Sequence, residues 1–332
     1  MNIVYLGSGE FGIECLNALA PPKAGLINPA SGRASHTLRF IVTQPPQPAG
    51  RGRTPNPTPV AHWAAAHSIP FIETDDVNAP GIIEKIAGFK PDLIVVIAFG
   101  QKVGIALTSL PPKGAINVHA SLLPKYRGAA PINWAIINSE TQTGISIITV
   151  AEKMDAGKIL TQLETGIGPD ETAGELHNRL AQMAAPLLLK TLDQIADGTA
   201  VYTEQDHSKA TLAPKLKKSD GFLDFTASAE SLRRRILGLW PWPGASATYI
   251  SKQTGKSIRV TIAMAEIVNT LNPSPDTSGA GTLDENLNVL CGRNALKITK
   301  IKPDGSRLMD FKDFTNGRHT QPGDMFVKID NR

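Results

Sequence analysis

Residues 92–98 (DLIVVIA) form a nearly unbroken apolar run with the length of one strand. A strand that is apolar on both faces has to be covered on both faces, which is the environment of a central strand in a parallel sheet. Further strands are expected at residues 3–6, 38–42, 115–118 and 144–150, with a short one ending at Ile72. Segments with helical periodicity separate them, at residues 11–20, 59–67, 81–87, 131–138 and 173–195. This alternation predicts an α/β fold with a doubly wound, mostly parallel sheet.

The pattern changes after about residue 200. Residues 213–219 (APKLKKS) are polar and basic, which is typical of a linker. A helix is expected at residues 227–237, followed by short strands at 247–250, 258–263, 288–291 and 296–301. Short strands separated by Gly, Pro and Asp turns predict a small β-barrel or sandwich, and of the two we expect an OB-like β-barrel. We therefore expect an α/β domain at 1–200, a linker at 201–218 and a C-terminal β-barrel domain at 219–332.

Composition excludes several classes of protein. The 332 residues, 41% of them hydrophobic, are enough for two domains with cores of their own. Cys15 and Cys291 are the only cysteines and lie far apart, so we expect neither a disulfide framework nor a metal site. There is no signal-peptide pattern and no apolar run near the roughly 20 residues of a membrane span, so we expect a cytoplasmic protein with no membrane partner. A net charge of +4 mildly favours an anionic partner.

The turn after the first strand, Gly7-Ser8-Gly9-Glu10-Phe11-Gly12, matches the GxGxxG pattern of dinucleotide sites. Such sites also place an acidic residue at the end of the second strand. The second strand ends instead in Val42-Thr43-Gln44. We therefore expect a tight turn at an open α/β sheet, and no NAD.

Asn117 and His119 alternate with Val118 at the end of an expected strand, so their side chains leave the same face. Ligands of open α/β sheets bind beyond the carboxyl ends of the strands. An amide and an imidazole at that place suit a site that stabilises an oxyanion and moves a proton. Asp155 then either orients His119 or is an ordinary turn residue before Gly157.

Two groups of basic residues stand out. Arg51 and Arg53 lie in a Pro/Gly/Arg-rich stretch, residues 44–59, that we expect to have no regular structure. The second group flanks the domain junction and consists of Lys215, Lys217, Lys218 and residues 233–235. Each group is either a solvated face or a surface that contacts phosphates.

Residues 117–131 (NVHASLLPKYRGAAP), together with Asp155-Ala156-Gly157, resemble the signature of the folate-dependent formyltransferases. Residues 43–53 resemble an inserted loop of the branch that acts on methionyl-tRNA, and Trp242-Pro243 with the β-rich tail resembles the tRNA-binding barrel of that branch. The chain departs from the branch at Pro46-Gln47, where Asp-Arg is usual, and its residues 21–37 are longer than the usual connection.

The resemblance implies a Rossmann-like catalytic formyltransferase domain and a barrel that binds tRNA. It implies formyl transfer from 10-formyltetrahydrofolate to the α-amino group of methionine on initiator methionyl-tRNA, for translation initiation. The catalytic residues would be Asn117, His119 and Asp155. The folate site would include Ser121, Leu122, Leu123 and Pro124. The tRNA would be contacted by Arg51, Arg53, Lys215, Lys217 and Lys218. We expect a monomer that uses neither a metal nor NAD.

Three alternatives remain open at this point. A formyltransferase acting on an amino-sugar nucleotide or another small amine would share Asn117, His119 and Asp155 and a folate site. A non-catalytic nucleotide- or RNA-binding protein would use the glycine-rich turn and the basic residues, and would not need His119. An NAD-dependent oxidoreductase would have to bind a nicotinamide cofactor.

Overall fold

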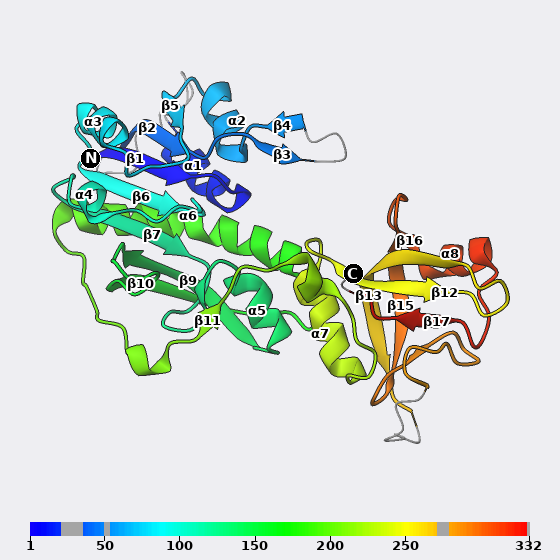
Figure 1. The fold of residues 1–332 in the computed structure, drawn as a ribbon. Coiled ribbons are helices and arrows are strands. Elements are labelled where there is room, and N and C mark those ends of the chain that lie inside the picture. The colour runs from blue at the N-terminus through cyan, green and yellow to red at the C-terminus, as the bar shows by residue number, and fades with distance from the viewer. Residues whose placement is uncertain (21–35, 50–53, 271–278, 331–332) are drawn as a thin grey trace, which may run out of the picture. The chain divides into compact units, whose positions relative to one another are not determined.

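The structure is a computed structural model that describes residues 1–20, 36–49, 54–270 and 279–330 (Figure 1). The chain folds into two compact units, each made of several segments. The first comprises Met1–Pro131, Gln142–Gly166 and His177–Pro214, and the second comprises Ile132–Thr141, Ile167–Leu176 and Lys215–Arg332. The stretch 201–214, most of the expected linker, therefore belongs to the first unit.

A seven-stranded sheet forms the centre of the first unit, drawn in blue to green in Figure 1, with strand order β10-β9-β7-β6-β1-β2-β5. The strands are β1 (Asn2–Gly7), β2 (Thr37–Thr43), β5 (Phe71–Glu73), β6 (Leu93–Ile97), β7 (Ala115–His119), β9 (Gln142–Thr149) and β10 (Ile159–Gly166). The five strands from β7 to β5 pair in parallel, and β9 and β10 pair antiparallel. The predicted doubly wound, mostly parallel sheet is confirmed.

Helices cover both faces of this sheet. They are the 3-10 helix η1 (Glu10–Gly12), α1 (Ile13–Leu19), α2 (Pro59–Ala66), α3 (Pro80–Gly88), α4 (Ile105–Thr108) and the part of α6 (Ala173–Asp197) from His177 onward. The helix α5 (Pro131–Ile137) belongs almost entirely to the second unit. Val4 and Ile94 pack in one cluster with Ile86 of α3, while Ile3 and Val95, which point the other way, are equally buried. The 92–98 run is apolar because β6 has no solvent-facing side.

The expectation of no regular structure at 44–59 is wrong. The strands β3 (Gln47–Ala49) and β4 (Thr54–Asn56) pair antiparallel, with Pro48 opposite Pro55. Neighbouring pairs in an antiparallel ladder alternate between those that exchange hydrogen bonds and those that do not, and facing prolines are compatible with a pair of the second kind. Arg51 and Arg53, like most of the long connection at residues 21–37, lie outside the described residues.

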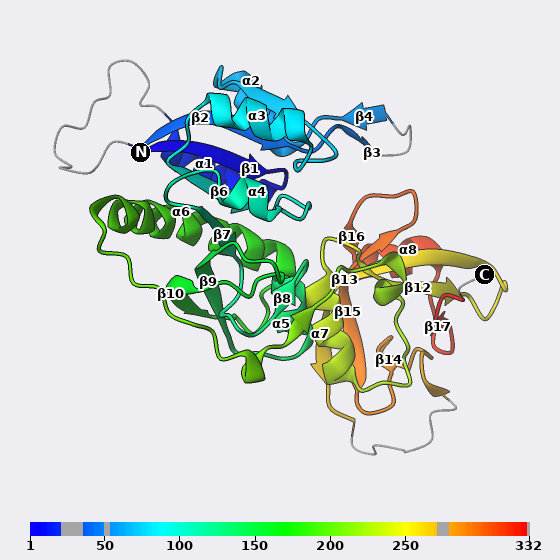
Figure 2. The same ribbon diagram turned by 60° about the vertical axis from the view of Figure 1, so that its left-hand side comes forward.

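The second unit carries a six-stranded antiparallel sheet, drawn in yellow to red in Figure 2. Its strands are β12 (Ala245–Ile250), β13 (Ser257–Val268), β14 (Val289–Leu290), β15 (Ala295–Pro303), β16 (Met309–Asp310) and β17 (Met325–Val327). The order is β14-β15-β13-β12-β17, with β16 on β15. Thr282 bridges to Met325 and Leu283 to Val289, so one short segment joins the two edges of the sheet. The predicted small β-barrel is confirmed as a nearly closed one.

Two helices complete the barrel unit, α7 (Ala229–Leu239) and α8 (Phe311–Arg318). Phe314 of α8 packs edge-on against Tyr249, which also contacts Phe326 of β17. Neither α8 nor β17 was predicted, since each is short. The remaining elements are β8 (Arg127–Gly128), β11 (Leu212–Ala213) and the 3-10 helices η2 (His207–Lys209) and η3 (Lys218–Gly221).

Candidate active site

Asn117 and His119 lie at the carboxyl end of β7, where the sheet changes from parallel to antiparallel. β7 pairs in parallel with β6 on one side, and antiparallel with β9 on the other. His119 is only 6% exposed, and Asn117 is half-buried. A buried imidazole needs partners for both ring nitrogens, so its neighbours decide what it can do.

Both ring nitrogens of His119 face oxygen atoms. Nε2 lies 2.9 Å from the backbone carbonyl oxygen of Tyr126. A carbonyl only accepts, so Nε2 carries a hydrogen and donates it. Nδ1 lies 3.6 Å from Oδ2 of Asp155, an ion-pair distance when the ring is protonated. The nitrogen that is free to exchange a proton is therefore Nδ1, beside the carboxylate.

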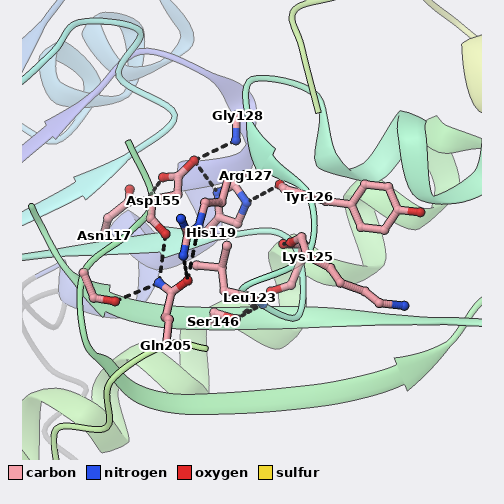
Figure 3. A network of polar contacts seen from close by, with 12 residues as sticks. Asn117, His119, Leu123, Lys125, Tyr126, Arg127, Gly128, Ser146, Asp155 and Gln205 are labelled. Carbon is pink, nitrogen blue, oxygen red and sulfur yellow. Dashed lines mark hydrogen bonds and ion pairs between the residues drawn. The ribbon is translucent and has the colours of Figure 1, made fainter. Parts of the chain in front are cut away.

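The Asp155 carboxylate is held from two other directions (Figure 3). Its Oδ2 accepts a 2.8 Å hydrogen bond from the backbone N–H of Gly128, and its Oδ1 accepts a 3.4 Å bond from Nδ2 of Asn117. Asn117, His119 and Asp155 thus meet in one place, as the family resemblance implied. The Asp155 carboxylate belongs to the turn after β9, and the backbone N–H of Gly128 belongs to β8.

The turn that carries Asp155 is strained. Asp155 has a φ of 51°, in the left-handed region that side chains rarely adopt. Two residues on, Gly157 packs so closely on Thr149 that a Cβ there would collide with the Thr149 carbonyl oxygen. Such a turn keeps its shape only if its surroundings hold it.

Gln205 and Arg127 complete the network and were missed by the sequence reasoning. Gln205 is 5% exposed and donates to the carbonyl oxygens of Asp155 and Gly157, while its own oxygen accepts from Arg127 (Figure 3). Arg127 lies inside the 117–131 stretch, so its sequence position offered a signal. Gln205 gave none, because a single glutamine in a polar segment resembles a solvated residue.

Of the predicted folate residues, Ser121 and Leu123 point into the protein. The Ser121 hydroxyl donates to the Lys125 carbonyl oxygen at 2.7 Å. The Ser146 hydroxyl donates to Ser121 O at 2.6 Å and accepts from Leu123 N at 3.0 Å. These buried bonds fix the shape of residues 121–124. Leu122 and Pro124 of the same turn are half-buried.

The predicted tRNA contacts are only partly described. Lys215, Lys217 and Lys218 are exposed in the second unit. Arg51 and Arg53 lie outside the described residues. Of the arginine run at 233–235, Arg233 pairs with Asp170 and donates to the carbonyl oxygen of Pro169, and Arg235 donates to Asp220 O. Those two arginines have structural partners within the second unit.

The second unit also contains a cavity of about 550 Å³ that the sequence did not indicate. Its lining includes the cationic side chains Arg259, Lys302 and Arg307, the carboxylate of Asp304, and Pro241 and Pro243. Trp242, between the two prolines, is 55% exposed. Three cations against one carboxylate make the cavity positive, which suits an anionic ligand.

Packing accounts for two glycines of the turn after β1. A Cβ on Gly7 would come within 2.5 Å of the buried Tyr5 ring, and one on Gly12 would collide with the Tyr5 hydroxyl. The backbone N–H groups of Ser8 and Gly9 both donate to the Ala98 carbonyl oxygen. The turn is thus fixed against its own sheet, as expected for a tight turn.

Thiol chemistry is excluded for both cysteines at neutral pH. Burial raises the pKa of Cys15 and that of Cys291 to about 12, so neither supplies a thiolate. Among the described residues, no group of three His, Cys, Asp or Glu side chains is placed to hold a metal ion. No helix in that same part of the chain is long and apolar enough to cross a membrane.

Two family models match the chain, Formyl transferase over residues 1–192 and Formyl transferase, C-terminal domain, over residues 215–319. The chain is 38% identical over 337 residues to the methionyl-tRNA formyltransferase of Citrifermentans bemidjiense, covering 99% of this chain and 98% of the relative. It is 37% identical over 325 residues to the methionyl-tRNA formyltransferase of Alkaliphilus oremlandii, covering 98% and 99%.

Solved structures share the fold at lower identity. An N-formyltransferase from Helicobacter canadensis, solved with folinic acid and dTDP-3-aminofucose, superposes with a TM-score of 0.58 at 15% identity. The match covers 89% of this chain and 98% of that one. HypX from Aquifex aeolicus, solved with tetrahydrofolic acid, has a TM-score of 0.53 at 17% identity, with 76% of this chain and 43% of that chain covered.

Proposed function

Because the chain belongs to the formyl transferase family, we propose that it moves the formyl group of 10-formyltetrahydrofolate to the α-amino group of methionine on initiator methionyl-tRNA. The observation that carries this function is the similarity over both units. Relatives named methionyl-tRNA formyltransferase are 36% to 38% identical over at least 95% of this chain. The Helicobacter canadensis N-formyltransferase, which was solved with the amino-sugar nucleotide dTDP-3-aminofucose, is only 15% identical.

The reaction is a transfer of an acyl group between two nitrogen atoms. The amine nitrogen of methionine bonds to the formyl carbon, whose carbonyl oxygen becomes an oxyanion. The bond from that carbon to N10 of the folate then breaks. The amine loses one proton and N10 gains one, so the reaction needs a donor at the oxyanion and a group that carries the proton.

The Asn117, His119 and Asp155 side chains fit these two tasks. Nδ2 of Asn117 has a hydrogen left over after its contact with Asp155, and this hydrogen would bind the oxyanion. Protonated His119 would add a positive charge nearby. The Asp155 carboxylate, 3.6 Å from Nδ1 of His119, would stabilise that charge and accept the amine proton, directly or through a water molecule.

The 121–124 turn would form one wall of the folate site. Its backbone is fixed by Ser146 and by Gln162, whose Nε2 donates to Leu123 O at 3.0 Å. Because this wall is already ordered, the binding of folate against it would cost little conformational entropy of the protein. The half-buried Leu122 and Pro124 offer the apolar surface that a flat ring system needs.

The second unit would supply most of the tRNA contacts. Lys215, Lys217 and Lys218 are exposed there, and the positive cavity with Arg259 and Arg307 belongs to the same unit. Phosphates bind such groups through charge and counterion release. The exposed Trp242 would stack on a base, as aromatic side chains in single-stranded RNA sites do. Arg51 and Arg53 remain proposed contacts of the inserted loop.

The test is an assay with purified protein, 10-formyltetrahydrofolate and either methionyl initiator tRNA or an amino-sugar nucleotide. We expect formylation of the tRNA, and a loss of about 10² or more in kcat for His119→Ala. His62→Ala is the matched control, because His62 is an exposed histidine of the same unit. Transfer to the sugar alone would overturn the proposed acceptor, and full activity of His119→Ala would overturn the proposed chemistry.

A further inference from the structure

Gln205 lies buried in the polar segment between α6 and β11. Its side-chain nitrogen Nε2 donates to the carbonyl oxygen of Asp155 at 2.8 Å and to that of Gly157 at 2.7 Å. Its oxygen Oε1 accepts from Arg127, at 3.2 Å from Nε and 2.6 Å from Nη2. All of the hydrogen-bonding groups of this side chain are therefore used at one place.

The orientation of this amide is fixed by its partners. A guanidinium only donates and a carbonyl only accepts, so Oε1 must face Arg127 and Nε2 must face the two carbonyls. Arg127 is held in turn, since its Nη2 lies 2.8 Å from Nδ1 of His207. No other residue type of similar size presents two donors on one side and an acceptor on the other, except asparagine, which is one methylene shorter.

Gln205 links the two backbone segments that supply groups to His119. One is the turn with Asp155, where Gln205 donates to the carbonyl oxygens of the residues on both sides of Ala156. The other is β8 with the residue before it, where Tyr126 O accepts from His119 and Gly128 N donates to Asp155. A shift of either segment would change the distance between His119 and the carboxylate.

The backbone conformation of Asp155 explains why the two hydrogen bonds from Gln205 matter. A φ of 51° at a residue other than glycine costs on the order of 1 kcal/mol and persists only where the surroundings impose it. The two bonds from Gln205 hold the carbonyl groups of Asp155 and Gly157, which follow the strained torsion directly, so they favour this conformation over a relaxed one.

We propose that Gln205 is a positioning residue for formyl transfer, which holds the Asp155 turn and β8 in register so that the carboxylate stays beside His119. This role rests on the proposed function. Gln205 acts through Asp155 and Arg127 and does not itself touch the substrates. Its loss should reduce kcat and leave the Michaelis constants for tRNA and folate nearly unchanged.

The experiment compares Gln205→Glu and Gln205→Met in the full-length protein. Both replacements keep the size of the side chain. An ionised Glu can still accept from Arg127 but cannot donate to the two carbonyls, and Met can do neither. We expect kcat to fall about 10- to 100-fold in each, because small displacements of catalytic groups cost this much. The same two substitutions at Gln182, exposed on α6, are the matched controls.

The pH profile separates positioning from a general packing defect. A protonated Glu regains one donor, so kcat of Gln205→Glu relative to wild type should rise as the pH is lowered towards the ordinary pKa of a glutamic acid, about 4.3. The same ratio for Gln205→Met should stay constant. Recovery of this kind is expected only if donation to the carbonyls is what matters.

Three outcomes would be decisive. Activity of both Gln205 variants equal to that of the Gln182 variants would overturn the positioning role. An equal fall for both that is independent of pH, with a matching loss of thermal stability, would overturn it too, since it would show only a packing role. A wild type that does not formylate methionyl-tRNA would overturn the proposed function itself. Thermal unfolding of each variant identifies the second case, and Gln205→Asn, which keeps the amide, supplies a further variant if Gln205→Met fails to fold.

Discussion

Oδ2 of Asp155 lies 3.6 Å from Nδ1 of His119, and the same oxygen accepts the backbone N–H of Gly128 at 2.8 Å. One carboxylate oxygen is therefore shared between an imidazole and a fixed backbone donor. The N–H holds the oxygen in place beside the imidazole. This relationship explains why the roles of the two residues can be tested separately.

Asp155→Asn should keep the bond from Gly128 and remove the charge, while the weak 3.4 Å contact from Asn117 is lost. The amide oxygen can still accept from Gly128, but it neither stabilises protonated His119 nor takes a proton from the amine. We expect kcat for formyl transfer to fall about 10² or more, with thermal unfolding little changed. Asp75→Asn, at an exposed aspartate of the same unit, serves as control. A variant with nearly full kcat would show that the carboxylate charge is not needed.

Ser146→Ala should weaken folate binding through the backbone. The Ser146 hydroxyl bonds Ser121 O, Leu123 N and Gln162 Nε2, and its removal leaves buried groups without a partner. We expect a loss of about 1–3 kcal/mol in the free energy of unfolding. The Michaelis constant for folate should rise more than that for tRNA, which steady-state kinetics measure. Equal rises would point to unfolding alone, and the exposed Ser109→Ala should change neither constant.

Local patterns were enough to predict most of the sheet and to place Asn117 and His119 at the end of a strand, whereas the place of Asp155 beside them rested on the family resemblance. Residues 92–98 had to be a covered strand because both of its faces are apolar, and the alternation of Asn117 and His119 placed them on one face. The strand β10 was not predicted because it is an edge strand with polar residues on both faces, so its pattern resembles that of a loop. The role of Gln205 was not predicted because it depends on contacts with distant parts of the chain. Its partners Asp155 and Gly157 lie 50 and 48 positions earlier in the sequence.

Removing the three exposed lysines at 215, 217 and 218 should weaken tRNA binding in a way that depends on salt. Each lysine that no longer neutralises a phosphate reduces the slope of log affinity against log salt by about 1. We expect Lys215, Lys217 and Lys218, all changed to Ala, to lower both affinity and slope in titrations of methionyl-tRNA. The control is the triple Ala variant of Lys85, Lys102 and Lys190, three exposed lysines on helices or loops of the first unit. If both triple variants change the slope equally, net charge and not this surface is responsible.

Cys15 should make the stability of the first unit depend on pH in the alkaline range. Its thiol has a pKa near 9.0 when exposed, and burial raises the pKa to about 12 in the folded protein. The folded state therefore holds its proton more tightly, and this contribution to stability is complete below about pH 9 and is lost as the pH rises towards 12. We expect the free energy of unfolding in urea to decline over this range, and to decline less steeply in Cys15→Ala.

That variant will be less stable at neutral pH because it leaves a small cavity. The quantity to compare is therefore the slope of the free energy of unfolding against pH, and not its absolute value. An identical slope in the two proteins would assign the alkaline loss to other groups, such as Tyr5, whose pKa burial also raises.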